Sequence, residues 1–182
     1  MKGSLTRTRI VLLVAAAVLV AGAWGTYRLL RWQDARAKVN RAQAYREIIW
    51  QHARDNSVPT ELVEAMIVAE SGGSPQAVSP KNARGLMQIT PITEREVLQR
   101  RRIDKGDLFD PDYNVLVGTA YLKMLADRFD GDWYLVLAAY HAGPTRVAQL
   151  RKAHPSLSGR ELVRRHASRS TAAYCRQILA GP

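Results

Sequence analysis

Glu70 is a carboxylate at a position where the helical pattern of the surrounding residues expects an apolar side chain. The apolar face of this segment is formed by Leu62, Val63, Met66 and Ile67. At about 100° per residue, Glu70 falls in the middle of that face, and Ser71-Gly72-Gly73 end the helix directly after it. Burial and the negative end of the helix dipole both raise the pKa of a carboxyl group there. Such a group suits general acid catalysis at neutral pH, although a helix-end glutamate that turns into solvent fits the pattern equally well.

The elements that must position this residue are helices. Asp110, Asp132 and Ser158 are typical N-cap residues, each placed before a segment with helical spacing. Gly143-Pro144 ends the helix that follows Asp132, and residues 171–179 form a last amphipathic helix. We therefore expect a helical domain in which segments far apart in the chain pack together.

Composition supports one folded domain. The chain has 182 residues, of which 47% are hydrophobic and 24% charged, which excludes a largely disordered protein. It has a single Cys, so no intramolecular disulfide can form. Strand-like alternation is scarce, although Gly, Pro and Asn within residues 76–90 are compatible with a short β-hairpin. The predicted fold class is mostly α.

Residues 10–27 form an uncharged and mostly apolar stretch, with basic residues on both sides. This length lies at the lower edge of a membrane-spanning helix. A cleavable signal peptide begins in the same way, and Ala21-Gly22-Ala23 offers a cleavage site. Trp24 and Tyr27 resemble interfacial anchors, which favours an uncleaved membrane anchor and leaves the signal peptide as the alternative.

The chain is predicted to consist of three parts. Residues 1–27 are the anchor or signal segment, residues 28–43 a charged helical stalk and residues 44–182 the folded domain. The formal net charge of +11 would suggest nucleic acid if it were spread over the whole chain. It divides, however, into +8 for residues 1–54, −4 for residues 55–142 and +7 for residues 143–182. No nucleic-acid partner is therefore expected.

Four motifs follow one another between Val58 and Val147. They are Glu70-Ser71-Gly72, then Gly85-Leu86-Met87-Gln88, then Asn114 with Gly118 and Tyr121-Leu122, and finally Ala139-Tyr140-His141-Ala142-Gly143-Pro144. In this order and at these separations, they resemble the catalytic domain of the soluble-type lytic transglycosylase family, which has a lysozyme-like fold. Each motif is weak alone, but the ordered set is specific. Thr171 and Tyr174 resemble the closing element of the family less well.

The resemblance implies cleavage of the β-1,4 bond between N-acetylmuramic acid and N-acetylglucosamine in peptidoglycan, leaving a 1,6-anhydro-muramic end. Ordinary glycosidases need two carboxylates, whereas only Glu70 lies inside a motif of this kind here. Asp110 and Asp112 are nearby candidates for a second acid, but Asp110 is better explained as a helix cap. One acid is sufficient if the acetamido group of the substrate stabilises the reaction centre and its C6 hydroxyl attacks.

Several residues around Glu70 are candidates for substrate binding. Ser71 either orients Glu70 or satisfies the helix end, and Gly85 allows the backbone to approach a sugar. Gln88 offers an amide to an N-acetyl group or to the leaving oxygen, with a solvent-facing turn residue as the alternative. Met87 forms either the wall of the cleft or part of the core.

Two tyrosines and a histidine complete the predicted site. The hydroxyl of Tyr140 holds or polarises Glu70 or the sugar, or else Tyr140 is a core residue, and the same alternatives apply to Tyr174. His141 can donate to a sugar and adds a group that titrates near neutral pH. The complete set of predicted substrate-binding residues is Ser71, Met87, Gln88, Tyr140, His141 and Tyr174. The chain departs from the family at His141, Ser170 and Cys175, where Asn, Glu and Val are usual.

The leading hypothesis is a transglycosylase in the inner membrane whose catalytic domain faces the periplasm, or a periplasmic enzyme if the N-terminal segment is cleaved. A true muramidase and a catalytically silent glycan-binding or scaffold module are the alternatives. A secretion or pilus assembly is a further partner that the resemblance allows. We expect no cofactor and no metal, because His52, His141, His154 and His166 show no ligand spacing.

Overall fold

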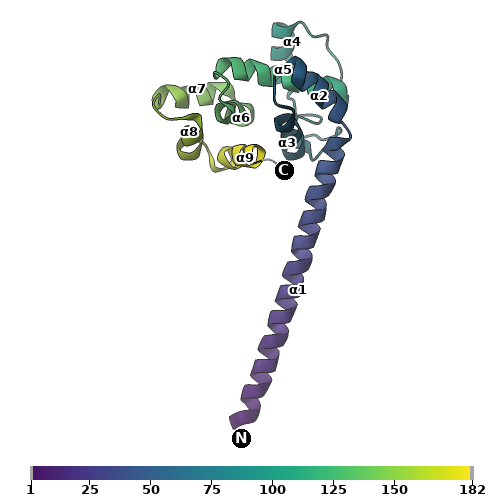
Figure 1. Ribbon diagram of the computed structural model, residues 1–182, viewed down its shortest axis with the longest axis vertical. Helices are drawn as coiled ribbons and strands as arrows, with labels where there is room; N and C mark the ends of the chain where they lie inside the picture. Colours follow the sequence, from purple (N-terminus) through teal and green to yellow (C-terminus); the bar gives the residue numbers. More distant parts are fainter. Residues whose placement is uncertain (1, 181–182) are drawn as a thin grey trace. The chain divides into compact units, whose positions relative to one another are not determined.

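A computed structural model describes residues 2–180 of the chain, with side chains from residue 9 onward, and these residues are mostly helical (Figure 1). This confirms the predicted fold class. The helices are α1 (Lys2–Gln43), α2 (Arg46–Asp55), α3 (Thr60–Ser71), α4 (Pro91–Arg101), α5 (Pro111–Arg128), α6 (Trp133–Ala142), α7 (Pro144–Ala153), α8 (Gly159–His166) and α9 (Arg169–Leu179).

The chain divides into two compact units, residues 1–38 and residues 39–182. The first unit consists of helix α1 as far as Lys38. The segment of α1 from Arg9 onward is long and apolar enough to cross a membrane, a property that signal sequences share. Arginines near the end of its uncharged stretch lie over aromatic rings one turn earlier. The Arg28 guanidinium is 4.8 Å from the centroid of the Trp24 ring. Aromatic and basic residues of this kind are typical of a membrane–water interface.

The second unit is built around helix α6, which packs against α5, α7, α8 and α9. Its buried residues are Leu135, Val136, Leu137, Ala138 and Ala139. Full burial of one such Val or Leu side chain contributes about 1.5–3 kcal/mol, so this helix anchors its neighbours. Helix α3 packs against both α2 and α9. The contact between α3 and α9 brings together segments from opposite ends of the domain.

Side-chain caps begin the helices at the predicted residues. Asp110 accepts a hydrogen bond from the Tyr113 backbone N–H at 2.9 Å, and Pro111 is the first residue of α5. Asp132 caps α6 and also accepts from the backbone N–H of Gly159 at 3.1 Å, which ties the start of α6 to the start of α8. The predicted caps at Asp110 and Asp132 are therefore confirmed. They could be predicted because each cap side chain bonds a backbone N–H only two or three residues further along the chain.

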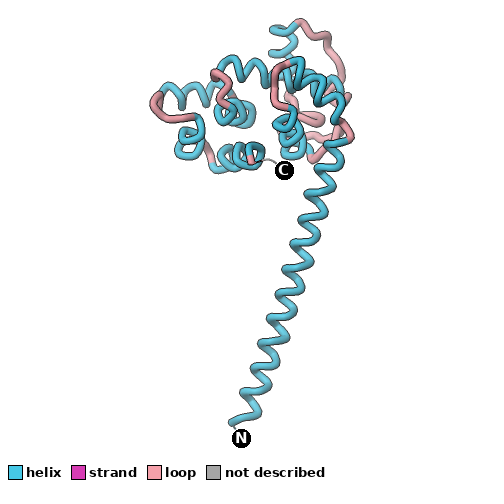
Figure 2. Tube along the Cα trace, in the orientation of Figure 1, coloured by secondary structure: helices cyan, strands magenta, loops and turns pink. Residues whose placement is uncertain are grey.

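The segment between α3 and α4 is irregular (Figure 2). The predicted hairpin within residues 76–90 is corrected: no regular strand forms in the described part of the chain. Only isolated antiparallel bridges occur, between Val78 and Arg84 and between Arg84 and Ile89. Asn82 and Gly85 have positive φ angles of 58° and 75°, so tight turns interrupt the pairing before a ladder can extend.

Candidate active site

Glu70 lies in the last turn of α3, which continues to Ser71 and stops at Gly72. Gly72 adopts a left-handed conformation with a φ angle of 61°, which is the usual way for glycine to end a helix. The Ser71 hydroxyl donates to the Ile67 carbonyl at 3.1 Å and accepts from the Gly73 backbone N–H at 3.2 Å. Of the two predicted roles for Ser71, its hydroxyl therefore serves the helix end.

Tyr174 contacts the carboxylate directly. Its hydroxyl donates a hydrogen bond to Oε1 of Glu70, with an O–O distance of 2.5 Å. The two residues come from α3 and α9, and the packing of these helices holds the pair together. A hydrogen bond to an ionised oxygen is shorter and stronger than one between neutral groups, so this contact orients the carboxylate and favours its charged form.

Burial raises the pKa of Glu70 above its usual value of 4.5, and the hydrogen bond from Tyr174 lowers it in part. Desolvation is the larger of these two effects. The position of the residue adds a further effect in the same direction, because the carbonyl end of α3 carries the negative end of the helix dipole. Glu70 thus has the environment of a carboxyl group that stays protonated at higher pH than usual.

Tyr140 lies near Glu70 but is bonded to a different partner. Its hydroxyl donates to the carbonyl oxygen of Met87 at 2.7 Å. Burial is the main cause that raises the pKa of Tyr140, followed by the charge of Glu70. Its ring lies 5.6 Å from that of Tyr121, centroid to centroid. Tyr140 therefore connects α6 to the backbone of the loop between α3 and α4 (residues 72–90), which we call the Met87 loop. The direct contact with Glu70 is made by Tyr174.

Asn114 holds the same loop from helix α5. Its side chain is completely buried, accepts from the Met87 backbone N–H at 2.8 Å and donates to the carbonyl of Leu108 at 2.7 Å. The close approach allowed by Gly85 is to this amide, since a Cβ on Gly85 would lie 2.2 Å from Nδ2 of Asn114. Gly85 thus serves packing within the protein. Asn114 is a positioning residue that the motif contained but whose role was not predicted.

Met87 and Gln88 both lie in the Met87 loop, but their side chains have different surroundings. The side chain of Met87 is fully buried, against Gly118 of α5, and so belongs to the core. Gln88 is partly exposed and has a φ angle of 51°. Its amide nitrogen donates to the carbonyls of Ala77 at 3.1 Å and Gly85 at 3.0 Å. This leaves the amide oxygen of Gln88 as the end of the side chain available to a ligand.

His141 lies beside Tyr174 at the end of α6. The two ring centroids are 4.7 Å apart, and Nδ1 of His141 is 3.2 Å from the Thr171 hydroxyl oxygen. Burial, followed by the positive charge of Lys81, lowers the pKa of the imidazole below its usual 6.5. The ring is therefore mostly neutral at pH 7. His141 and Tyr174, which the sequence predicted separately, form one wall beside Glu70.

The arrangement is a single half-buried carboxyl group, held by a tyrosine hydroxyl and faced by a loop whose backbone is fixed from two helices. Comparison with known proteins identifies its family. Residues 47–163 match the model of the transglycosylase SLT domain. The chain belongs to this family. The matched region contains Glu70, Met87, Gln88, Tyr140 and His141, whereas Tyr174 lies beyond its end.

Relatives of the SLT domain include soluble and membrane-bound proteins. The chain is 33% identical over 108 residues to a soluble lytic murein transglycosylase of Escherichia coli, covering 57% of this chain and 17% of the relative. A putative soluble lytic murein transglycosylase of Haemophilus influenzae is 31% identical over 172 residues, 92% of this chain and 27% of the relative. A membrane-bound lytic murein transglycosylase E of Buchnera aphidicola is 31% identical over 119 residues, 59% of this chain and 54% of the relative.

A solved structure of a lytic transglycosylase has the same fold. The inactive Glu-to-Gln mutant of the Slt enzyme of Pseudomonas aeruginosa superposes with a TM-score of 0.71 and 29% identity, covering 75% of this chain and 23% of that one. The chain thus spans about a sixth to a quarter of the length of the soluble relatives that it matches. The lysozyme-like SLT fold is shown by this likeness together with the family match.

The two further acids considered from the sequence, Asp110 and Asp112, have other partners. Asp110 caps α5, and Asp112 lies 3.0 Å from Nε2 of His52 on α2. Within residues 9–180, no group of three or more His, Cys, Asp or Glu side chains is arranged to hold a metal ion.

Proposed function

We propose that the chain is a lytic transglycosylase that cleaves the β-1,4 bond between N-acetylmuramic acid and N-acetylglucosamine in peptidoglycan and forms a 1,6-anhydro-muramic end. The observation that carries this proposal is the pairing of Glu70 with Tyr174 at the end of α3. It supplies one carboxyl group whose pKa is raised by burial and which the Tyr174 hydroxyl holds in one orientation. The family membership supports the same substrate.

Glu70 acts first as a general acid. Its proton passes to the glycosidic oxygen as the bond to C1 of the muramic residue breaks, and the acetamido oxygen of the substrate stabilises the positive charge at C1. Glu70 is then a carboxylate, whose negative charge the Tyr174 hydroxyl stabilises at 2.5 Å. Before the proton transfer, the mechanism requires a raised pKa at Glu70. After the transfer, it requires a hydrogen-bond donor to the Glu70 carboxylate, and the Tyr174 hydroxyl is that donor.

Glu70 acts second as a general base. The carboxylate accepts the proton of the C6 hydroxyl group, and the C6 oxygen bonds to C1 in place of the acetamido oxygen. This restores the protonated Glu70 and closes the 1,6-anhydro ring without water as acceptor. The partners of Asp110 and Asp112 support a mechanism with one acid, because a second carboxylate next to the bond is what ordinary glycosidases require.

The products of peptidoglycan digestion test this function. Purified sacculi digested by the chain should give muropeptides with 1,6-anhydro ends in mass spectrometry. Reducing ends without anhydro products would instead identify a muramidase. Glu70→Gln should lose the products, whereas Glu61→Gln, an exposed glutamate on the same helix, serves as the matched control. Binding of sacculi by the wild type without any cleavage would identify a glycan-binding or scaffold module.

We further propose that residues 10–27 anchor the chain in the inner membrane and that the domain faces the periplasm. The apolar helix and the aromatic–arginine pairs at its end support an anchor. The mass of the mature protein in the membrane fraction distinguishes the alternatives. An intact N-terminus supports the anchor, and a chain beginning after Ala23 identifies a cleaved signal peptide. Association with a secretion or pilus assembly stays a prediction.

A further inference from the structure

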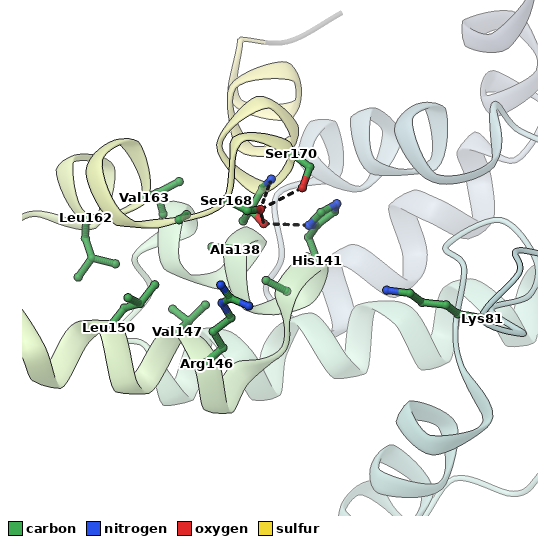
Figure 3. Close-up of a pocket in the computed structure, with 13 residues that line it drawn as sticks. Lys81, Ala138, His141, Arg146, Val147, Leu150, Leu162, Val163, Ser168 and Ser170 are labelled. Carbon is green, nitrogen blue, oxygen red and sulfur yellow. Dashed lines mark hydrogen bonds between the residues drawn. The ribbon is translucent and has the colours of Figure 1, made fainter.

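A pocket of about 220 Å³ lies where the end of α6, the start of α7 and the connection between α8 and α9 meet (Figure 3). Val147, Leu162 and Val163 lie behind its lining and are at most 2% exposed, so its open surface is mainly that of its polar side chains. Lys81 extends toward it from the irregular loop on one side, and Arg146 rises from α7 on the other (Figure 3). Ser168 and Ser170 add hydroxyl groups at its edge.

The pocket carries positive charge without a matching negative charge. Lys81, His141 and Arg146 line it, and none of its lining residues is acidic. Among the described residues, neither Lys81 nor Arg146 makes an ion pair. Two exposed cations at one pocket with no acidic side chain in its lining favour an anionic ligand such as a carboxylate.

The pocket is connected to the proposed catalytic residue through a continuous set of contacts. Tyr174 is bonded to Glu70, and its ring lies 4.7 Å from that of His141, which lines the pocket. His141 in turn contacts Thr171, whose hydroxyl oxygen is 2.8 Å from that of Ser168. A polymer whose sugar lies at Glu70 would therefore have its nearby substituents beside this pocket.

We propose that the pocket binds a free carboxylate of the short peptide that peptidoglycan carries on its muramic acid residues. This inference rests on the proposed function. A guanidinium group can hold a carboxylate through two parallel hydrogen bonds, and Lys81 supplies a second charge. A carboxylate of the peptide is favoured over a free inorganic anion because the pocket adjoins Tyr174 and His141 beside Glu70, where the muramic residue would bind. The pocket thus makes the peptide, in addition to the glycan, a determinant of specificity.

The test compares two substrates, glycan strands that carry their peptides and strands from which an amidase has removed them. The Lys81→Met/Arg146→Gln variant should lower the ratio of kcat/KM on peptide-bearing to denuded strands by about tenfold, the size expected for lost charge-assisted bonds. The matched control is Lys105→Met/Lys152→Gln, which removes two exposed cations outside the pocket and should keep the wild-type ratio. An unchanged ratio in the pocket variant would overturn the proposal.

A second measurement needs no variant. Wild-type protein should cleave strands whose peptide carboxylates have been amidated about tenfold less efficiently than the unmodified strands, and added salt should reduce this difference. Equal cleavage of both substrates rules out the carboxylate site but leaves the transglycosylase function intact. If no anhydro products form from any substrate, the proposed function itself fails, so the two failures are distinguishable.

Discussion

Two glutamate–tyrosine pairs lie in the described part of the domain, and only one of them has the environment that the proposed mechanism requires. Tyr174 donates to Glu70 at 2.5 Å, and Tyr113 donates to Glu94 at 2.9 Å. Glu70 is half-buried in the last turn of α3, whereas Glu94 is 8% exposed in the first turn of α4. Each glutamate accepts a hydrogen bond from a tyrosine hydroxyl. The two pairs therefore differ in the helix end at which the glutamate lies and in its surroundings.

The two glutamates also lie at opposite ends of their helices. Glu94 lies in the first turn of α4, where a helix presents N–H groups and the positive end of its dipole. The last turn presents carbonyl groups, which oppose the ionisation of Glu70 in the same direction as its burial. Glu94 is thus suited to joining α4 to α5, and Glu70 to gaining and losing a proton.

The largest effect that we predict separates the two glutamates by activity. Glu70→Gln should lower the rate of anhydro-muropeptide release about 10²–10⁴-fold, which is the usual contribution of a general acid–base group. Glu94→Gln should keep wild-type activity within about threefold, because Glu94 contacts Tyr113 in the core and lies outside the proposed site. Comparable losses in both variants would contradict the assignment of Glu70.

The two tyrosines give the second prediction. Tyr174→Phe removes the hydrogen bond that lowers the pKa of Glu70, so this pKa should rise further. The alkaline limb of the pH–rate profile, which reports loss of the protonated acid, should then move to higher pH, and the maximal rate should fall about tenfold. Tyr113→Phe is the matched control and should leave the limb in place. A downward shift for Tyr174→Phe would show that the hydroxyl favours the neutral acid.

The sequence predicted the local features of the fold better than the connections between them. Caps at Asp110, Asp132 and Ser158 were predicted because donor and acceptor lie within three residues. Helix α7 was missed because Gly143-Pro144 was interpreted only as the end of α6, although Pro144 also begins the next helix. Helix α4 had a similar signal in Thr90-Pro91, since Thr90 accepts from the Thr93 backbone N–H.

The site shows the same division between local features, which the sequence predicted, and contacts between distant segments, which it did not. The helical phase of Glu70 indicated a carboxylate among apolar residues, because one helix face can be derived from the sequence alone. The partner of Glu70 could not be derived in this way, since Tyr174 lies on a helix 104 residues further along the chain. For the same reason, the bond between Tyr140 and the Met87 carbonyl depends on how α6 packs against the loop, which no short-range pattern contains.

The third prediction concerns stability. Substitution of the two glutamates by glutamine should change the free energy of unfolding at pH 7 in opposite directions. The folded state raises the pKa of Glu70 above 4.5, so ionisation costs stability as the pH rises through that range, and the cost remains at neutral pH. Glu70→Gln should therefore increase the free energy of unfolding at pH 7 by roughly 0.5–2 kcal/mol. The increase should disappear below about pH 4.5, where the unfolded carboxyl group is also protonated.

Glu94→Gln should have the opposite effect at pH 7. Loss of a carboxylate at the start of α4 removes its favourable interaction with the helix dipole, worth about 0.3–1 kcal/mol. Denaturant unfolding of the three proteins at pH 7 and pH 4 measures both differences. Destabilisation of the domain by both substitutions at pH 7 would contradict the contrast between the two helix ends.

The smallest predicted effect concerns His141, which lies against Tyr174 and so affects only the Glu70 pair. Its pKa is lowered by burial and by Lys81, so it becomes charged only on the acidic side of its usual 6.5. A charged imidazole there favours ionisation of Glu70 and so reduces the fraction of protonated acid. His141→Asn should therefore extend activity to lower pH while changing the maximal rate less than about threefold.

Substitution of Lys81 offers a control for this last prediction, because it should move the acidic limb of the pH–rate profile in the opposite direction. Removal of its positive charge in Lys81→Met allows the pKa of His141 to rise, so the acidic limb should move to higher pH. The groups that face the imidazole are Thr171, Tyr174, Lys81 and, across the pocket, Arg146. Of these groups, Lys81 is the one whose charge disfavours the charged imidazole. A common direction of shift in His141→Asn and Lys81→Met would place the titrating group of the acidic limb elsewhere, and Glu70 itself would then be the first residue to examine.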